Sequence, residues 1–267
     1  MVKLFLIRIL LVLFLCVSGK VKAQQAAEER IIVRVLTLNI LHGATTKGDF
    51  DLDVISELIN STTPDLVALQ EVDFKTNRAK NLDLTTELAQ RTGMTSYYAK
   101  AMDYDGGAYG EGVLSKWPIL SAKSVALPHQ PTSEPRAAAE IIITISPGDT
   151  IRFIGTHLDH LKENRDRLMQ VKAINQKLAG GDHPAILAGD LNDIPTSKPI
   201  KILESQWNAA YLETRLEPTF PSNDPKKKID YIMYAPKAAW KVLESKTICD
   251  QIASDHCAYL VVLEFLP

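Results

Sequence analysis

The sequence predicts an α/β fold: a four-layer α/β/β/α sandwich in which two packed, mixed and largely antiparallel β-sheets are flanked by helices. Three observations predict it. Apolar, β-branched segments of strand length recur along the chain, amphipathic helical segments lie between some of them, and a hairpin turn at 146–149 joins two strands. Strands this apolar need cover on both faces, which packed sheets and helical layers provide.

The N-terminal half is predicted to contain two helices between strands. At 52–60 apolar residues recur with helical spacing, with Asp51 as a candidate N-cap and Pro64 as the stop. A shorter helix at 84–93 is predicted to end at Gly93. The predicted strands of this half are IIVRVLTLNI (31–40), DLVALQEV (65–72), EGVLSKWPI (111–119) and AAAEIIITI (137–145).

The C-terminal half continues the same mixture. The strand IRFIGTHLDH (151–160) runs into His157, and helical spacing follows over 164–178 until Gly180 and Gly181 end it. The remaining predicted strands are AILAGD (185–190), KIDYIMY (228–234) and CAYLVVLEFL (257–266). The chain has 267 residues and no internal repeat or long linker, so we expect one folded domain.

The N-terminus has the pattern of a secretory signal peptide. A basic start, an apolar stretch and a VKA-Q junction predict a signal over residues 1–23, cleaved after Ala23, and a catalytic domain over 24–267. We therefore expect a periplasmic or secreted protein. Because Arg8 interrupts the apolar stretch, an uncleaved membrane anchor is the alternative.

Charge and cysteine content restrict the partners. Cleavage would remove four basic and no acidic residues, changing the formal net charge from −2 to −6. An acidic protein does not hold nucleic acid by bulk charge. The one basic run is Lys226–Lys228, for which a solvated loop is the alternative reading. Cys249 and Cys257 remain after export and would form either a disulfide or two buried free thiols.

Polar residues gather at the strand ends. Such ends meet on one rim of a packed sandwich, where carboxylates and an amide can bind a hard divalent cation, a carboxylate can orient a histidine, and amide or arginine donors can hold a phosphate. Taken singly, most of these residues could be structural. Asp230 is the exception, because a carboxylate in so apolar a strand is costly unless a partner such as a histidine pairs with it. The residues are Asn39, Glu71, His157, Asp190, Asn192, Asp230, Asp255 and His256.

With these residues in place, the chain resembles the endonuclease/exonuclease/phosphatase superfamily, whose fold is DNase I-like, and in particular its small exported bacterial members. Eight segments occur in the family's order and cover nearly all of the mature chain. They are TLNI (37–40), LQEVD (69–73), GVLSKWPI (112–119), EPRAA (135–139), GTHLD (155–159), GDLND (189–193), KIDYIM (228–233) and SDH (254–256).

The resemblance implies a role for each residue. The metal site would be formed by Asn39, Glu71 and Asp255. The catalytic residues would be His157, Asp190, Asn192, Asp230 and His256. Tyr109, Arg136 and Asn192 would contact the substrate phosphate. Glu111 would orient His157, and Asp230 would orient His256.

The implied activity is hydrolysis of a phosphodiester or phosphomonoester by in-line attack of water, with Mg²⁺ as the expected ion and Mn²⁺ or Ca²⁺ as alternatives. The substrate is expected to be small or lipid-linked, so membrane contact would come only through the signal peptide or such a substrate. A secreted nuclease acting on DNA or RNA and a non-catalytic phosphate-binding module are the alternatives. Arg165 and Arg167 could reach substrate, but we expect them to lie on a solvated helix face. We expect a monomer.

Overall fold

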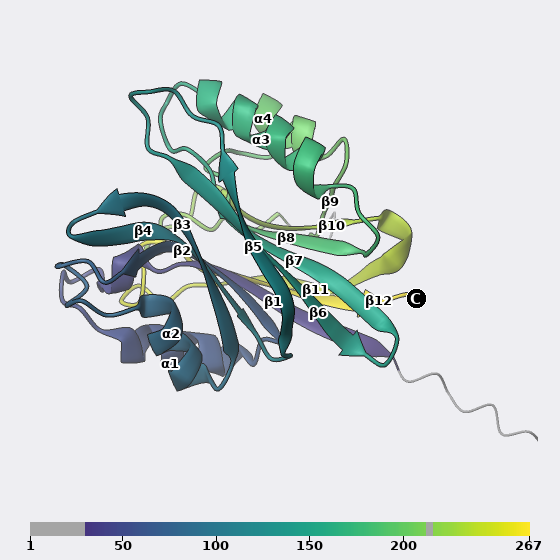
Figure 1. The fold of residues 1–267 in the computed structure, drawn as a ribbon, viewed down its shortest axis with the longest axis horizontal. Coiled ribbons are helices and arrows are strands. Elements are labelled where there is room, and N and C mark those ends of the chain that lie inside the picture. Colours follow the sequence, from purple (N-terminus) through teal and green to yellow (C-terminus); the bar gives the residue numbers. More distant parts are fainter. Residues whose placement is uncertain (1–29, 212–215) are drawn as a thin grey trace, which may run out of the picture.

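The computed structural model describes residues 30–211 and 216–267. They form two six-stranded β-sheets packed face to face, with helices on both outer sides (Figure 1). The predicted four-layer α/β/β/α sandwich is therefore confirmed. The predicted signal peptide lies outside the described residues. Within the described part of the chain, no helix has the length and apolar character needed to cross a membrane.

The first sheet has the strand order β11-β12-β1-β2-β4-β3, and only its β1–β2 pair is parallel. The N-terminal strands lie at its centre beside the C-terminal strand. The strands are β1 (Ile31–Asn39), β2 (Leu66–Phe74), β3 (Thr95–Tyr104), β4 (Gly107–Ser115), β11 (Trp240–Ile248) and β12 (Ala258–Phe265).

The second sheet has the order β5-β6-β7-β8-β10-β9, and only its β7–β8 pair is parallel. Both sheets are thus mixed and largely antiparallel, as predicted. The strands are β5 (Ile119–Leu127), β6 (Arg136–Ser146), β7 (Asp149–His157), β8 (Ala185–Asp190), β9 (Asn208–Ala209) and β10 (Asp230–Ala235).

Two helices cover each sheet (Figure 1). On the first sheet lie α1 (Leu52–Thr62) and α2 (Leu84–Thr92); on the second lie α3 (Arg165–Leu178) and α4 (Lys198–Leu203). The predicted caps are present, because the Asp51 side chain accepts from the first turn of α1 and Gly93 ends α2 at a φ of +68°. The described residues also contain two short 3₁₀ turns, η1 (Leu41–Gly43) and η2 (Lys237–Ala239).

Apolar side chains fill the three spaces between the layers. The central space holds β-branched and aromatic residues from both sheets, such as Val35, Val113, Ile141 and Phe153, all fully buried. Separate apolar clusters lie beneath each helix pair. This burial, worth about 1.5–3 kcal/mol for each large side chain, holds the strand ends in fixed positions at the rim.

Four of the strands in the described residues are not predicted from the sequence or are misplaced: β3, β5, β9 and β11. The strand predicted at 111–119 is in fact the second half of β4 followed by a break, and β5 begins at Ile119. All four are outer strands of their sheets, and most of their residues are exposed or only half-buried. Edge strands carry polar side chains that prevent further pairing, so they lack the apolar run on which the prediction depended.

Candidate active site

The strand ends of both sheets converge on one cavity of about 380 Å³. Most of the residues singled out in the sequence line this cavity. They are Glu71, Tyr109, Arg136, His157, Asp190, Asn192, Asp255 and His256. Three others lie behind the lining: Asn39 contacts Glu71, Asp230 contacts His256, and Glu111 is fully buried. The structure therefore brings the predicted residues to one place.

Asp190 is positioned by the register of three neighbouring strands. It ends β8 and lies opposite His157 of β7 on one side and Asp230 of β10 on the other. Gly189 before it allows β7 and β8 to approach, since a Cβ at Gly189 would lie 1.9 Å from the Thr156 carbonyl oxygen. An apolar, rigid strand thus ends in a carboxylate held between two ionisable neighbours.

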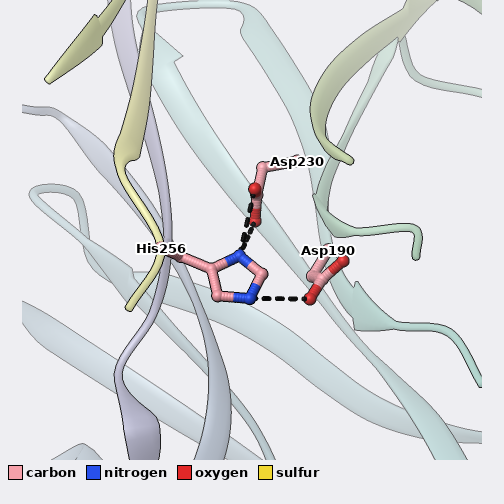
Figure 2. Close-up of side chains that lie close together, drawn as sticks. All are labelled: Asp190, Asp230 and His256. Atoms are coloured by element: carbon pink, nitrogen blue, oxygen red, sulfur yellow. Dashed lines mark hydrogen bonds and ion pairs between the residues drawn. The ribbon is translucent and has the colours of Figure 1, made fainter. Parts of the chain in front are cut away.

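His256 connects the two sheets (Figure 2). It precedes β12 of the first sheet, and its Nδ1 lies 3.1 and 3.2 Å from the two carboxylate oxygens of Asp230 on the second sheet. Its Nε2 lies 3.6 Å from Asp190 Oδ2. Burial lowers the pKa of His256, but the charges of Asp230 and Asp190 and the Asp230 hydrogen bond outweigh it and raise the pKa to about 10. His256 is therefore an imidazolium at neutral pH.

His157 has the opposite surroundings. Its Nε2 lies 3.5 Å from the same Asp190 oxygen, but it also faces the Asn192 Nδ2 donor at 2.9 Å, and its Nδ1 faces Arg136 Nη1 at 3.1 Å. A neutral imidazole can accept at only one nitrogen, and both neighbours are donors. Burial and the charge of Arg136 hold the pKa of His157 well below its usual value, so this ring is neutral.

Asp190 itself is poised near neutrality. Its pKa rises to about 7, chiefly through burial, while the charge of His256 opposes the rise. The backbone N–H of Asn192 donates to Asp190 Oδ1 at 2.9 Å. Asn192 has a φ of +51°, a conformation that asparagine tolerates better than most residues, and this turn brings its amide back toward His157. A carboxylate with such a pKa suits general-base catalysis.

Glu111 does not contact His157 in the way the resemblance implied. Arg136 Nη1 approaches His157 Nδ1, and neither Glu111 carboxyl oxygen has a hydrogen-bond partner among the residues described. Burial raises the pKa of Glu111 well above its usual value, so it is a neutral acid. Arg136 also contacts Tyr109 and donates to Glu134 at 2.9 Å. The group that faces His157 Nδ1 is thus a guanidinium.

Glu71 reaches the cavity through a β-bulge. The β2–β4 register shifts between Leu69 and Val72, and Glu71 has a φ of +58°, a strained value for a residue with a side chain. Asn39 Nδ2 donates to Glu71 Oε1 at 3.1 Å, and His42 Nδ1 lies 3.6 Å from Oε2. Burial raises the pKa of Glu71. Hydrogen bonds from His42 and Asn39, together with the charges of His157 and His42, outweigh burial and lower this pKa to about 2. Because His157 is neutral, His42 and Asn39 are the main stabilising neighbours.

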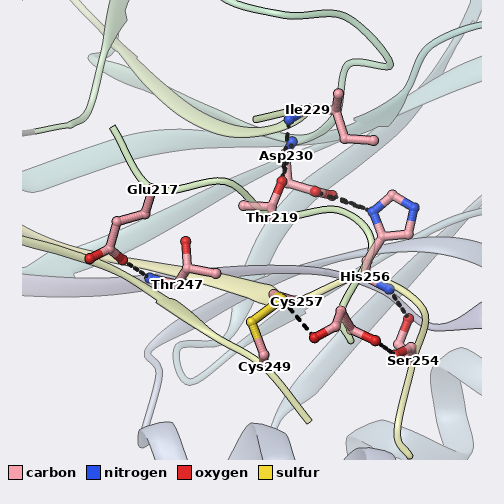
Figure 3. Close-up of a disulfide and its surroundings, with 10 residues drawn as sticks. Glu217, Thr219, Ile229, Asp230, Thr247, Cys249, Ser254, His256 and Cys257 are labelled. Carbon is pink, nitrogen blue, oxygen red and sulfur yellow. Dashed lines mark hydrogen bonds and ion pairs between the residues drawn. A yellow bond between two sulfur atoms is a disulfide. The ribbon is translucent and has the colours of Figure 1, made fainter. Parts of the chain in front are cut away.

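Asp255 and His256 lie in a loop closed by the Cys249–Cys257 disulfide (Figure 3). This bond decides between the two alternatives that the cysteines left open. Ser254 ties the loop to the first sheet, because its hydroxyl donates to the Asn39 carbonyl at 2.7 Å and accepts from the His256 N–H at 3.1 Å. The loop is therefore held at both ends next to the cavity.

Comparison with known proteins identifies the family. The sequence model of the endonuclease/exonuclease/phosphatase family matches residues 36–256. The chain belongs to the endonuclease/exonuclease/phosphatase family. Members of this family hydrolyse phosphoesters, so the chain is a hydrolase of this family.

Solved structures of the family share the fold. An endonuclease/exonuclease/phosphatase from Beutenbergia cavernae superposes with a TM-score of 0.74 at 21% identity, covering 88% of this chain and 72% of that one. The human Nocturnin catalytic domain with bound sulfate gives 0.69 at 20%, covering 89% and 96%. A Bacteroides thetaiotaomicron mannosyl-6-phosphatase gives 0.68 at 18%, covering 87% and 100%.

Two groups of residues could hold the metal ion that the endonuclease/exonuclease/phosphatase family implies. Ligand atoms of Asp190, Asp230 and His256 lie within 4.8 Å of one another. Both nitrogens of His256 already face carboxylates there, so a cation would have to displace a strongly held proton. At the second group, Glu71 is ionised and the buried Oδ1 of Asp255 has no hydrogen-bond partner in the described chain. The second group fits a cation better.

The sequence reading missed several residues of this family site. His42, Arg78 and His160 line the cavity, and His160 Nδ1 lies 3.1 Å from Arg136 Nη2. A signal existed for two of them, because His42 and His160 each lie three residues beyond a polar residue that had been singled out, in TLNILHG and GTHLDH. Arg78 follows a strand end by four residues and gave no comparable signal.

Two expectations about basic residues were wrong. Arg167 does not lie on a solvated helix face: it is buried and donates to the Asp159 and Leu161 carbonyls at 2.8 and 2.6 Å. Lys228 does not belong to an exposed basic run, because it is only 4% exposed and its ammonium lies over the Tyr259 ring. Arg167 supports the loop after β7, and only two exposed lysines remain of the basic run.

Proposed function

We propose that this protein is an exported, divalent-metal-dependent phosphoesterase that acts on a small or lipid-linked phosphoester. The observation that carries the proposal is the chain of contacts Asp230–His256–Asp190–His157 at the lining of the cavity. It combines a carboxylate with a pKa near 7, a protonated imidazole and a neutral one around a single space. These groups can accept a proton from an attacking water and donate a proton to the leaving group of the same phosphate.

In the proposed mechanism Asp190 accepts the proton of the attacking water. His256, kept protonated by Asp230, supplies positive charge and a proton toward the leaving group. Asn192 and Arg136 donate hydrogen bonds to the phosphoryl oxygens, where charge develops in the transition state. Glu71 with Asn39 and Asp255 would hold the divalent ion, which supplies Lewis-acid stabilisation of phosphoryl and leaving-group oxygens when bound.

The size and charge of the cavity support a small substrate. A volume of about 380 Å³ lies in the range of small-molecule sites. A nuclease would be expected to show a basic surface for the backbone of its substrate, and Lys228 is buried while Lys226 pairs with Asp224. We therefore favour a small or lipid-linked phosphoester over DNA or RNA.

The test is hydrolysis of bis-p-nitrophenyl phosphate by the purified protein, with and without Mg²⁺ and EDTA. We expect metal-dependent turnover that Glu71→Gln abolishes, together with weakened Mn²⁺ binding by calorimetry in that variant. Asp230→Asn is the matched control, since it removes a charge from the alternative metal group. Normal Mn²⁺ affinity in Glu71→Gln but not in Asp230→Asn would move the metal to that group. Turnover unaffected by EDTA would reject the metal-dependent mechanism.

The substrate class follows from a panel. Plasmid DNA, RNA, sphingomyelin vesicles, phosphoinositides and sugar phosphates should be compared at physiological salt. We expect the highest kcat/KM for a small or lipid-linked compound. Faster degradation of plasmid or RNA than of every small substrate would favour a nuclease instead, and no hydrolysis at all would favour a phosphate-binding module.

A further inference from the structure

One wall of the cavity contains an arginine that the proposed mechanism does not use. Arg78 lies in the loop after β2 and lines the cavity together with Tyr104 and Tyr109. Tyr109 is a neighbour of both arginines: the Arg78 guanidinium lies 5.9 Å from the Tyr109 ring, and Tyr109 contacts Arg136 of the reacting centre. Arg78 is therefore a second cationic group in the same cavity.

The guanidinium of Arg78 is held in place from behind. Its Nε and Nη2 donate to the two carboxylate oxygens of Asp73 at 2.6 and 2.9 Å, and Asp73 is fully buried. Thr76 Oγ1 donates to the same carboxylate at 2.6 Å. The loop is fixed as well, because the Arg78 N–H donates to Asp105 at 2.7 Å. A group so constrained loses little further freedom when it binds a ligand.

The Nη1 edge of this guanidinium remains for a ligand, and the Arg78 side chain is 31% exposed. Tyr104 covers part of a face, with Arg78 Cζ 4.5 Å from the ring centroid, and the Tyr104 side chain is itself 40% exposed. The hydrogen bonds found in the described chain use Nε and Nη2 and leave Nη1 without a partner. Guanidinium edges bind phosphate in a planar, two-pronged geometry.

We propose that Arg78 binds a second phosphate group of the substrate, distinct from the one that is hydrolysed. This inference rests on the proposed function and narrows its substrate class to compounds carrying two phosphate groups. The reacting phosphate belongs beside Asp190, where Arg136 and Asn192 already supply donors, so Arg78 is left for the other group. Tyr104 provides an exposed aromatic surface on which the part of the substrate between the two phosphates can pack.

The test compares paired ligands that differ by one phosphate. Adenosine 3′,5′-bisphosphate against adenosine 5′-monophosphate, and fructose 1,6-bisphosphate against fructose 6-phosphate, are measured as competitors of bis-p-nitrophenyl phosphate hydrolysis. We expect each bisphosphate to inhibit about tenfold to hundredfold more strongly than its monophosphate, and Arg78→Gln to remove most of that ratio. The two pairs show whether the preference depends on a nucleoside or on the phosphates alone.

Arg91→Gln is the matched control. The Arg91 side chain has the same 31% exposure and is likewise paired with carboxylates, but it lies on α2 and does not line the cavity. We expect it to leave the ratio unchanged. The double variant Asp73→Asn/Arg78→Gln, which leaves no buried carboxylate unpaired, should lose the ratio as the single variant does. Equal inhibition by the bisphosphate and the monophosphate of each pair in the wild type would overturn the proposal. So would variants in which inhibition by the bisphosphates and by the monophosphates is weakened by the same factor.

Calorimetric binding of the same ligands separates this inference from the proposed function. If the protein binds bisphosphates through Arg78 but has no hydrolytic activity, the proposed function is wrong and the second phosphate site is supported. If the protein hydrolyses phosphoesters but shows no preference for bisphosphates, the proposed function is supported and the second phosphate site is wrong.

Discussion

The surroundings of His157 and His256 differ in one respect that decides what each ring can do. Both rings are buried, and both lie within 3.6 Å of the same oxygen of Asp190. Beyond this shared carboxylate, the Nδ1 of His256 faces the Asp230 carboxylate, whereas the nitrogens of His157 face a guanidinium and an amide. Burial alone would make both rings neutral. The neighbours, and not the depth of burial, therefore set the charge of each histidine.

This difference divides the work within the site. His256 can hold a positive charge and a proton throughout the neutral range, while His157 stays neutral and can accept or relay a hydrogen bond. Asp190 lies between them with a pKa near 7. Groups of unlike charge placed around one point are the arrangement that acid–base chemistry at neutral pH requires.

Replacement of the shared carboxylate should have the largest effect. Asp190→Asn keeps the shape but removes the base, so kcat should fall about 10²–10⁴-fold, measured with bis-p-nitrophenyl phosphate under saturating metal. Asp224→Asn, an exposed aspartate paired with Lys226, is the control and should retain activity. Near-normal turnover in Asp190→Asn would remove this residue from the mechanism.

The same variant should be more stable than the wild type above neutrality. The folded pKa of Asp190 is raised to about 7, so its stabilising contribution is complete below its unfolded pKa and is lost as the pH rises through about 7. Asparagine carries no charge at any pH. Thermal unfolding should therefore give Asp190→Asn the higher Tm at about pH 8, with the gap shrinking as the pH falls toward about 5. A gap independent of pH would contradict burial as the cause.

Loss of the carboxylate behind His256 should have the second-largest effect. In Asp230→Asn an amide replaces the charge that raises the pKa of His256, so that pKa should fall toward its ordinary value. We expect the alkaline limb of the pH–rate profile to move down from about 10 and kcat at about pH 8 to fall about 100-fold. Nitrogen NMR of the imidazole would report the protonation directly.

Stability should fall in Asp230→Asn as well. The raised pKa of His256 means that its contribution is fully present below the unfolded pKa of about 6.5 and is lost as the pH rises through about 10. The variant should thus unfold more readily than the wild type across the neutral range. An unchanged alkaline limb together with an unchanged Tm would show that Asp230 does not govern His256.

Most of the fold and most of the cavity residues could be predicted from the sequence, and the reasons are physical. Central strands such as β8 and β12 are fully buried and so appear as apolar runs, and the polar residue that ends such a run is conspicuous. Asp230 was assigned a histidine partner because an unpaired charge in that strand would be too costly, and His256 is that partner. Edge strands were missed because their exposure removes the signal.

What could not be predicted was which neighbour faces which nitrogen. The contact of Arg136 with His157 depends on the register of β6 against β7 and on a side-chain direction, neither of which leaves a trace in residue order. The bulge that aims Glu71 into the cavity is likewise a property of pairing with β4. Arg78 lies in a loop that is held in place by Asp105, and this contact joins segments that are far apart in the chain. Residue order alone does not predict such a contact.

The smallest of the predicted effects on rate is also the most direct test of the comparison. Asn192→Asp puts a carboxylate in place of the amide that lies 2.9 Å from His157 Nε2, so that this ring, like His256, would face two carboxylates. Aspartate tolerates the φ of +51° at this position as asparagine does. The pKa of His157 should rise from well below its usual value to above it, and kcat should fall about tenfold because a negative charge replaces a phosphate donor.

Asn192→Gly separates the added charge from the lost donor. Glycine accepts the same backbone conformation and removes the amide without supplying a carboxylate. In that variant His157 still faces Arg136, so its pKa should stay low, as nitrogen NMR of the ring would show. If Asn192→Asp and Asn192→Gly both leave His157 neutral at about pH 6, burial and not the neighbouring groups sets its charge, and the contrast with His256 must then come from Asp230 alone.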